Sequence, residues 1–200
     1  MNWLEQLHGR YVAERRARVL AQRLAAITPK GVSVLDVGCG DGALASELSR
    51  LRPDLEIRGT DVLLRPDACI EVTKYDGQHL AEDEAGVDVV LMVDTIHHSE
   101  DPEQLLLEAC RVARQSLIIK DHRRNGLWAE TTLRFMDRIG NARHGVALPY
   151  TYWSEAEWRE KWADRNLRVE LFRSDLHLYP PPFSLVFDRG LHFLARLELD

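Results

Sequence analysis

The sequence predicts an α/β fold in which a mostly parallel β-sheet carries helices on both faces. Short, almost continuously apolar segments, of which Val87–Val93 (VDVVLMV) is the clearest, are typical of strands buried on both sides. Amphipathic segments with apolar residues three and four positions apart alternate with these strands, as in successive βαβ units. The length of 200 residues suits one domain with a substantial core, so we expect residues 1–200 to form a single domain.

The N-terminal segment, residues 1–30, is predicted to contain a long helix. Apolar residues recur at helical spacing from residue 3 to about residue 28, and Pro29 stops the helix. We expect the arginines of this helix to form a solvated face, with an anion-binding stripe as the alternative. These arginines are Arg10, Arg15, Arg16, Arg18 and Arg23.

The middle of the chain alternates between predicted strands and helices. Asp101 is a good N-cap for one of these helices, Pro102 suits its first position, and Gln104 can complete a capping box. In chain order we expect a strand at 32–37, a helix at 43–51, strands at 55–61, 70–74 and 87–93, the helix after Asp101, and a strand at 116–119.

The last third of the chain has a different pattern. We expect a helix at 126–140, a second helix opened by the capping box Ser154–Glu157, and an antiparallel pair of strands at 167–172 and 191–199. The final strand alternates apolar and polar residues, which predicts one buried face. Residues 122–153 are interpreted as an insertion that caps the substrate side. Its large apolar side chains either line an apolar pocket or pack the insertion onto the domain; they are Trp128, Phe135, Met136, Tyr150, Tyr152 and Trp153.

Composition excludes several classes of partner. The net charge of −6 disfavours a nucleic acid, because binding to a phosphate backbone draws on Lys and Arg. No apolar run approaches the roughly 18 residues that a membrane helix needs, so we expect no stable membrane insertion. The N-terminus has no apolar signal core and the three cysteines show no paired spacing, which predicts a cytoplasmic protein. The oligomeric state is left open.

A glycine-rich stretch, VSVLDVGCGDGALA, follows the first predicted strand and indicates a nucleotide ligand. It satisfies both Gly38-x-Gly40-x-Gly42 and the dinucleotide form Gly38-x-Gly40-x-x-Ala43. Acidic residues end the next three strands, and the carboxyl ends of parallel strands meet at the edge where ligands bind. A pyrophosphate is repelled by nearby carboxylates, whereas a ligand with an ammonium group and ribose hydroxyls suits them. S-adenosylmethionine is such a ligand.

The combination of LDVGCGDG, DGQHL, DVVLMVDTIHH and DPEQLLLEACRV resembles the class I S-adenosylmethionine-dependent methyltransferases, of the small-molecule, type 11-like kind. The resemblance covers roughly Val32–Asp121. It implies a Rossmann-like, seven-stranded, mostly parallel sheet with an antiparallel last strand and helices on both faces. It also implies S-adenosyl-L-methionine as the cofactor.

The resemblance assigns roles to the residues at this edge of the sheet. Gly38 and Gly40 would approach the methionine part, Asp61 the ribose hydroxyls and Asp76 the adenine amino group. Asp94 with Thr95 would meet the methionyl end. The full set of expected cofactor-binding residues is Asp36, Gly38, Cys39, Gly40, Asp61, Val62, Asp76, Gly77, Asp94 and Thr95.

Histidines are the candidate catalytic residues, because methyl transfer to a hydroxyl or protonated amine needs a general base near neutral pH. His97, His98 and His122 lie at adjacent strand ends, and we expect His98 to be the base, with an apparent pKa of roughly 6 to 7. Asp94, Asp121 and His122 offer a metal site of the catechol-type kind. That family would fit better with Asn in place of His122, so no metal is expected.

These features predict an enzyme that methylates a small-molecule acceptor with an apolar portion. Two alternatives remain open at this point. One is a catalytically inactive protein of the same fold that binds S-adenosylmethionine or a partner. The other is an NAD-dependent oxidoreductase, which the pattern Gly38-x-Gly40-x-x-Ala43 alone supports.

Overall fold

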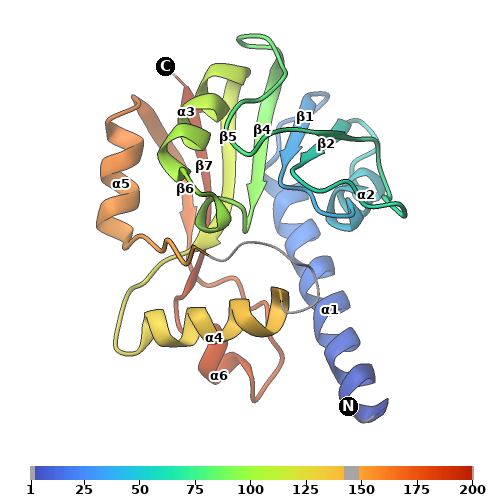
Figure 1. The fold of residues 1–200 in the computed structure, drawn as a ribbon, viewed down its shortest axis with the longest axis vertical. Helices are drawn as coiled ribbons and strands as arrows, with labels where there is room; N and C mark the ends of the chain where they lie inside the picture. The colour runs from blue at the N-terminus through green and yellow to red at the C-terminus, as the bar shows by residue number, and fades with distance from the viewer. Residues whose placement is uncertain (1–2, 142–148, 200) are drawn as a thin grey trace.

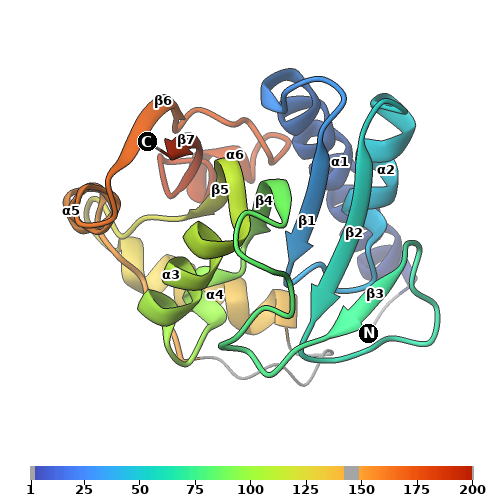
Figure 2. The same ribbon diagram turned by 90° about the horizontal axis from the view of Figure 1, so that it is seen from above.

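The computed structural model describes residues 3–141 and 149–199. It shows a twisted central sheet with helices packed against both faces and further helices across one end (Figure 1, Figure 2). The predicted α/β fold is therefore confirmed. The insertion expected at 122–153 includes residues 142–148, which lie outside the described residues.

The sheet has seven strands in the order β3-β2-β1-β4-β5-β7-β6. Neighbouring strands from β3 to β5 are parallel, whereas β7 runs antiparallel to both β5 and β6. β7 thus lies one strand inside the edge, and β6 forms the edge itself. The strands are β1 (Ser33–Val37), β2 (Glu56–Asp61), β3 (Val72–Lys74), β4 (Val87–Val93), β5 (Ala113–His122), β6 (Leu167–Arg173) and β7 (His192–Leu199).

Helices α1 (Trp3–Ile27) and α2 (Ala43–Leu51) cover one face of the sheet. Helices α3 (Pro102–Val112) and α5 (Glu155–Ala163) cover the other face (Figure 2). The short 3-10 helix η1 (Ile96–His98) follows β4. Helices α4 (Ala129–Asn141) and α6 (Ser184–Phe187) lie beyond the carboxyl ends of the parallel strands (Figure 1).

Each face of the sheet has its own hydrophobic core, because consecutive residues of a strand point to opposite faces. Val34 of β1 packs with Leu24 of α1 and Leu48 of α2. Its neighbour Leu35 belongs to the core that contains Trp158 of α5. Burial on both faces explains why these strands read as continuous apolar runs.

Both predicted helix starts are present. The Asp101 carboxylate accepts a hydrogen bond from the Gln104 N–H at 3.0 Å, and Pro102 occupies the first turn. Ser154 and Glu157 form the full capping box at the start of α5. Capping residues satisfy N–H groups that have no partner inside the helix, so these starts depend on local sequence.

Several elements differ from the sequence-based expectation, among them the four-residue helix α6, which was not predicted. β5 extends to His122, because its residues from Ser116 to His122 pair with β7. β7 was expected to bury one face, yet His192, Phe193, Leu194 and Ala195 are all buried because the strand lies inside the sheet. The single turn η1 has too few residues for a periodic pattern and was not predicted.

Helix α4 crosses the carboxyl end of the sheet on a small core of its own (Figure 1). Ala129 and Leu133 of α4 pack there with Tyr152 and Leu191. The helix is thereby held beside the strand ends from which the candidate residues project. Within the described part of the chain, no helix is both long and apolar enough to cross a membrane.

Candidate active site

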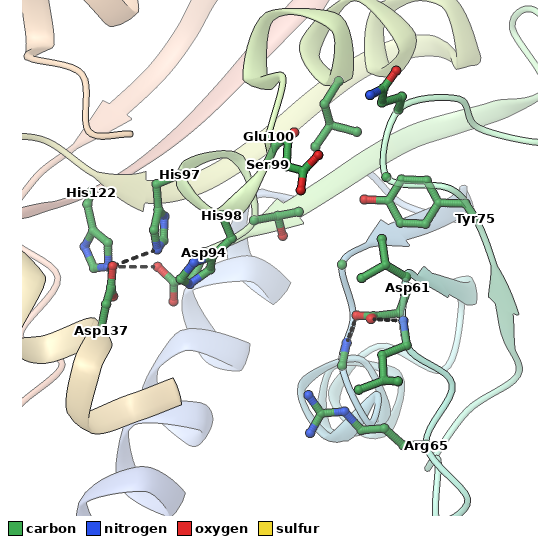
Figure 3. Close-up of a pocket in the computed structure, with 18 of the residues that line it drawn as sticks. Asp61, Arg65, Tyr75, Asp94, His97, His98, Ser99, Glu100, His122 and Asp137 are labelled. Carbon is green, nitrogen blue, oxygen red and sulfur yellow. Dashed lines mark hydrogen bonds and ion pairs between the residues drawn. The ribbon is translucent and has the colours of Figure 1, made fainter. Parts of the chain in front are cut away.

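A cavity of about 730 Å³ lies at the carboxyl ends of the parallel strands, where ligands bind in open α/β sheets. The loops after β1, β2 and β4 line it together with η1, the end of β5, and side chains from α1 and α4 (Figure 3). The structure brings most of the predicted residues together in this lining. They are Gly38, Gly40, Asp61, Val62, Asp76, Gly77, Asp94, Thr95, His97, His98 and His122.

Gly38 and Gly40 both have positive φ angles, of 73° and 63°, but they face different surroundings. A Cβ on Gly38 would lie 2.5 Å from Cγ2 of Thr95, whose hydroxyl donates to the Val37 carbonyl at 2.9 Å. A Cβ on Gly40 would approach nothing closer than the Arg65 guanidinium at 3.8 Å. The absence of a side chain at Gly38 therefore makes room for the Thr95 side chain. At Gly40 it leaves the backbone open to the cavity.

Asp61 ends β2 and holds the glycine loop in place. One carboxylate oxygen accepts the Gly40 N–H at 2.8 Å, and the other accepts the Leu63 N–H at 2.9 Å. Each oxygen has further lone pairs, so the carboxylate can accept hydrogen bonds from a ligand in the cavity as well. The carboxylate position is thus fixed before any ligand arrives.

Asp76 and Gly77 form the turn after β3. The Asp76 carboxylate accepts the N–H groups of Gln78 and His79 at 2.8 and 2.7 Å and contacts the His79 ring at 3.0 Å. These hydrogen bonds hold the pKa of Asp76 well below its usual range. The side chain is exposed and borders the open end of the cavity near Val62.

Asp36 and Cys39 are predicted cofactor contacts that do not line the cavity. Asp36 is buried within β1, and burial together with the neighbouring Asp61 carboxylate raises its pKa to about 7. The Cys39 sulfur packs against Gly59 of β2, where a Cβ would lie 2.5 Å from it. Burial raises the pKa of the Cys39 thiol to about 12. Both side chains pack against the sheet and neither lines the cavity, unlike the other predicted cofactor contacts.

Asp94, which follows β4, forms ion pairs with two cations from other elements. Its Oδ2 accepts from Arg16 of α1 at 2.5 Å, and its Oδ1 accepts from the ammonium of Lys120 on β5. Burial alone would raise the pKa of Asp94, but Lys120 and Arg16 hold it well below its usual range. The expected solvated face of α1 is therefore wrong for Arg16, which points into the cavity.

His97 lies between two buried carboxylates. Its Nδ1 is 2.5 Å from Oδ1 of Asp121, whose Oδ2 also accepts the Ile96 N–H at 3.2 Å. Its Nε2 is 3.5 Å from Oδ2 of Asp137 on α4, and Tyr152 donates to the same Asp137 oxygen. Burial alone would lower the pKa of the His97 imidazole, but Asp121 and Asp137 outweigh this effect and raise the pKa to about 10. His97 is consequently protonated at neutral pH.

His98 and His122 have the opposite electrostatic state. Burial and the neighbouring His97 lower the pKa of His98. Burial and Lys120 hold the pKa of His122 well below its usual range. Both imidazoles are therefore neutral near pH 7, and both line the cavity (Figure 3).

Sequence reasoning gave no site role to two residues of this cluster, Lys120 and Asp137. It named Arg16 only in the alternative of an anion-binding stripe and Tyr152 only as an apolar side chain of the insertion. Lys120 stands in the motif KDH at the end of β5, and a lysine inside an apolar strand run is the signal that could have identified it. Of the apolar residues in the insertion, Met136 lines the cavity, Tyr152 and Trp153 pack inward, and Trp128 and Phe135 are exposed.

The architecture is that of a Rossmann-like methyltransferase, and solved structures share it. A chain of the complex between the Haloferax volcanii Trm112 methyltransferase activator and a methyltransferase is 18% identical, with a TM-score of 0.69 and coverage of 98% of this chain and 95% of that one. A Thermotoga maritima S-adenosylmethionine-dependent methyltransferase is 19% identical, with a TM-score of 0.65 and coverage of 98% and 96%. One from Aquifex aeolicus is 21% identical, with a TM-score of 0.57 and coverage of 86% and 84%.

Residues 8–171 match the family model described as a methyltransferase domain, and the chain belongs to this family. S-adenosyl-L-methionine is accordingly its cofactor. This membership decides between the two patterns of the glycine loop and sets the NAD interpretation aside. No match is found among curated proteins.

Proposed function

We propose that the protein transfers the methyl group of S-adenosyl-L-methionine to a small-molecule acceptor with an apolar portion. The observation that carries this proposal is one continuous cavity, which has Asp61, hydrogen-bonded to the Gly40 N–H, at one end and the histidines with Asp137 at the other (Figure 3). A single cavity of about 730 Å³ lies within the range of small-molecule sites. It therefore supports binding of cofactor and acceptor side by side.

The residues at the first end of the cavity fit the cofactor. The fixed Asp61 carboxylate is suited to the ribose hydroxyls, and the open backbone of Gly40 permits a close approach. Arg16 and Asp94 form an ion pair at the cavity wall, so a guanidinium and a carboxylate are both near the position proposed for the methionyl end. These two charges match the carboxylate and the ammonium of an amino acid.

The cofactor supplies an electrophilic methyl group on a sulfonium. The chain's part in the reaction is to align the acceptor with that group and to remove a proton from it. His98 is the residue we assign to proton removal, because its imidazole is neutral at pH 7 and lines the cavity. His97 is a weaker base candidate, since it already carries a proton, and it would help to hold the acceptor.

The apolar side chains that border the acceptor end support a partly apolar acceptor. Met136 of α4, Leu105 of α3 and Tyr179 line the same cavity as the histidines. Such a wall favours burial of a hydrocarbon or aromatic portion, while the histidines meet the polar group that is methylated.

The test of cofactor binding uses calorimetry with S-adenosylhomocysteine. We expect binding in the micromolar range, and we expect Asp61→Ala to weaken it by about 1.5 to 3 kcal/mol, because a carboxylate that accepts two hydroxyl groups is lost. NAD serves as the control ligand and is expected not to bind. Unchanged S-adenosylhomocysteine affinity in a folded Asp61→Ala variant would place the ribose elsewhere.

Turnover with a panel of metabolites then distinguishes an enzyme from an inactive binding protein of the same fold. Once an acceptor is known, His98→Asn is expected to lower turnover by about 10² to 10⁴ with little change in cofactor affinity. Because the pKa of His98 is lowered, the wild-type rate should stay level through pH 7 and fall on the acid side, below pH 6.5. Full activity of His98→Asn, with exposed His177→Asn as the control, would refute the role of His98.

A further inference from the structure

Five large apolar side chains are exposed on the two helices that lie beyond the strand ends. Leu127 and Trp128 directly precede α4 and are 85% and 75% exposed, and Phe135 of α4 is 54% exposed. On α6, Leu185 is 75% exposed and Val186 is 48% exposed. None of the five lines the cavity of the candidate active site. We call these five residues the α4–α6 patch.

The two segments that carry the patch are in contact with each other. Arg189, which follows α6, donates to the Val186 carbonyl at 3.0 Å and to the Thr132 hydroxyl of α4 at 3.2 Å. Thr132 and Phe135 are three positions apart and therefore lie on the same side of α4. Figure 1 shows both helices at the same end of the molecule. The exposed apolar residues thus belong to one region of the surface.

Helix α4 has apolar residues on both its inner and its outer side. Leu133 is completely buried, and Met136 and Asp137 line the cavity, whereas Phe135 is exposed. A helix that only packs against a domain usually has apolar residues on its inner side and polar residues outside. Large exposed apolar patches mark sites of contact with another molecule or a membrane. The α4–α6 patch is therefore a candidate docking surface.

The charged side chains around the patch are mostly positive, although the whole chain has a net charge of −6. On α4 and in the segment 183–190, three exposed arginines accompany one exposed acidic residue; they are Arg134, Arg138, Arg189 and Glu130. The excess of positive charge is local to this end of the molecule. It complements a negatively charged surface.

We propose that the α4–α6 patch docks reversibly on an anionic lipid surface. Exposed leucine, phenylalanine and tryptophan beside arginines are typical of interfacial binding, in which apolar side chains enter the headgroup region and arginines meet lipid phosphates. Such a contact does not require a membrane-spanning helix. A second copy of this chain is a poorer occupant, because a symmetric dimer would bring the same arginines together.

Docking at this surface also suggests how an acceptor reaches the cavity, a step that rests on the proposed function. Phe135 is exposed and the next two residues line the cavity, so α4 alone separates the patch from the acceptor end. The diameter of a helix with its side chains is about 10 Å. The acceptor class that fits this arrangement is an amphiphile, whose hydrocarbon portion is dissolved in the lipid and whose polar group is methylated.

The test measures binding of the whole chain to phosphatidylcholine vesicles with and without phosphatidylglycerol, in the absence of cofactor and acceptor. We expect binding only where phosphatidylglycerol is present, and weaker binding at higher salt concentration, because salt screens exposed charges. Trp128→Ser and Leu185→Ser should each weaken binding by about 10-fold or more, since an apolar side chain no longer enters the lipid. Arg138→Gln should weaken it by about fivefold, the contribution of one arginine at an anionic surface.

Matched controls come from exposed residues on helices that cover the faces of the sheet. Leu107→Ser of α3 removes an apolar side chain that is 52% exposed, and Arg50→Gln of α2 removes an exposed arginine. Both variants should bind vesicles as the wild type does. Circular dichroism confirms that each variant is folded, which we expect because all the altered side chains are exposed.

Three results would overturn the docking proposal. The first is a folded wild-type protein that does not bind vesicles containing phosphatidylglycerol. The second is vesicle binding that Trp128→Ser and Leu185→Ser leave unchanged. The third is a wild-type dimer in light scattering that Leu185→Ser converts to a monomer, which would show that a second copy covers the patch.

Calorimetry with S-adenosylhomocysteine, in the absence of vesicles, tests the proposed function separately. Vesicle binding in the expected order without S-adenosylhomocysteine binding would support the docking surface and contradict the proposed function. S-adenosylhomocysteine binding without vesicle binding would contradict the docking surface alone.

Discussion

Each glycine in the loop after β1 has a different neighbour, and this neighbour determines whether the glycine is needed for packing or leaves space for a ligand. Gly38 makes room for Thr95, whose hydroxyl ties the start of η1 to the end of β1. Gly40, two positions on, borders the cavity and only the end of the flexible Arg65 side chain approaches it. Within one motif, Gly38 is therefore needed for packing, whereas Gly40 leaves space in the cavity.

We predict that Gly38→Ala and Gly40→Ala have different consequences. The first places a methyl group against Thr95 and should lower the free energy of unfolding by about 2 kcal/mol or more, because close-packed interiors tolerate little added volume. The second should cost about 1 kcal/mol of backbone strain at its positive φ, yet it should reduce S-adenosylhomocysteine affinity strongly. Urea unfolding and calorimetry measure the two effects. Equal stability loss in both variants would contradict this distinction.

Asp36 shows how burial makes a carboxyl group sensitive to pH. Its pKa in the folded protein is about 7, raised by burial and by Asp61 above the ordinary value of 3.8. The folded state thus binds a proton more tightly than the unfolded chain does. The stability that this group contributes is complete below pH 3.8 and is lost as the pH rises through 7.

We predict that Asp36→Asn, which resembles the protonated acid, stabilises the ligand-free protein at pH 8 and has little effect at pH 4.5. The gain at pH 8 should be on the order of 4 kcal/mol, since the pKa of Asp36 rises by about three units and one pKa unit corresponds to about 1.4 kcal/mol. Denaturant unfolding of both proteins at the two pH values tests this. A variant that is less stable than wild type at pH 8 would show that the ionised carboxylate has a stabilising partner.

At the scale of elements, the ion pairs of Asp94 connect α1, the end of β4 and β5. Lys120 is completely buried, and Asp94 lies against its ammonium, whereas Arg16 is partly exposed. Removing one member of a buried pair leaves an uncompensated charge, which costs more than the pair itself contributes. Asp94 is therefore the central residue of this connection.

We predict that Asp94→Asn destabilises the protein by about 3 kcal/mol and that Lys120→Met in the same chain restores much of the loss. Arg16→Gln should cost about 1 kcal/mol or less, because its side chain is partly solvated. Unfolding free energies of the single and double variants provide the test. If the double variant were no more stable than Asp94→Asn, the unpaired charge of Lys120 would not be the cause of the destabilisation.

The elements that were predicted correctly are those whose signal is local. The boundaries of α2 and β4 agree with apolar spacing, and the start of α5 agrees with its capping box. The site was predictable where residues end a strand or come within a few positions after it, as Asp61, Asp94 and His97 do. Residues from segments distant in the sequence carry no such signal. Arg16 and Asp137 belong to helices far in sequence from the strand ends that they contact, and only the packed fold brings them to the cavity.

At the scale of the whole molecule, the two hydrophobic cores and helix α4 at the strand ends contribute to different properties. The cores on each face of the sheet hold the strands in register, and α4 adds Asp137 and Met136 to the cavity from outside the sheet. On the proposed function, substitutions at these cavity-lining residues of α4 can therefore alter which acceptor fits without changing the sheet. The end of the cavity proposed for the cofactor is built from the strand ends and the loops that follow β1, β2 and β3.

The position of β7 affects how the protein is made. During translation, β5 and β6 emerge from the ribosome before β7. These two strands do not pair with each other, because β7 (residues 192–199) lies between them in the sheet and pairs with both. Until that segment emerges, one edge of β5 stays open, β6 is detached, and Phe193 is missing from its place against Trp158 and Trp162. The sheet therefore completes after nearly all of the described chain has been synthesised. During that interval, neighbouring nascent chains on a polysome can pair with the unprotected edge, so aggregation should compete with folding most strongly in these last moments of translation.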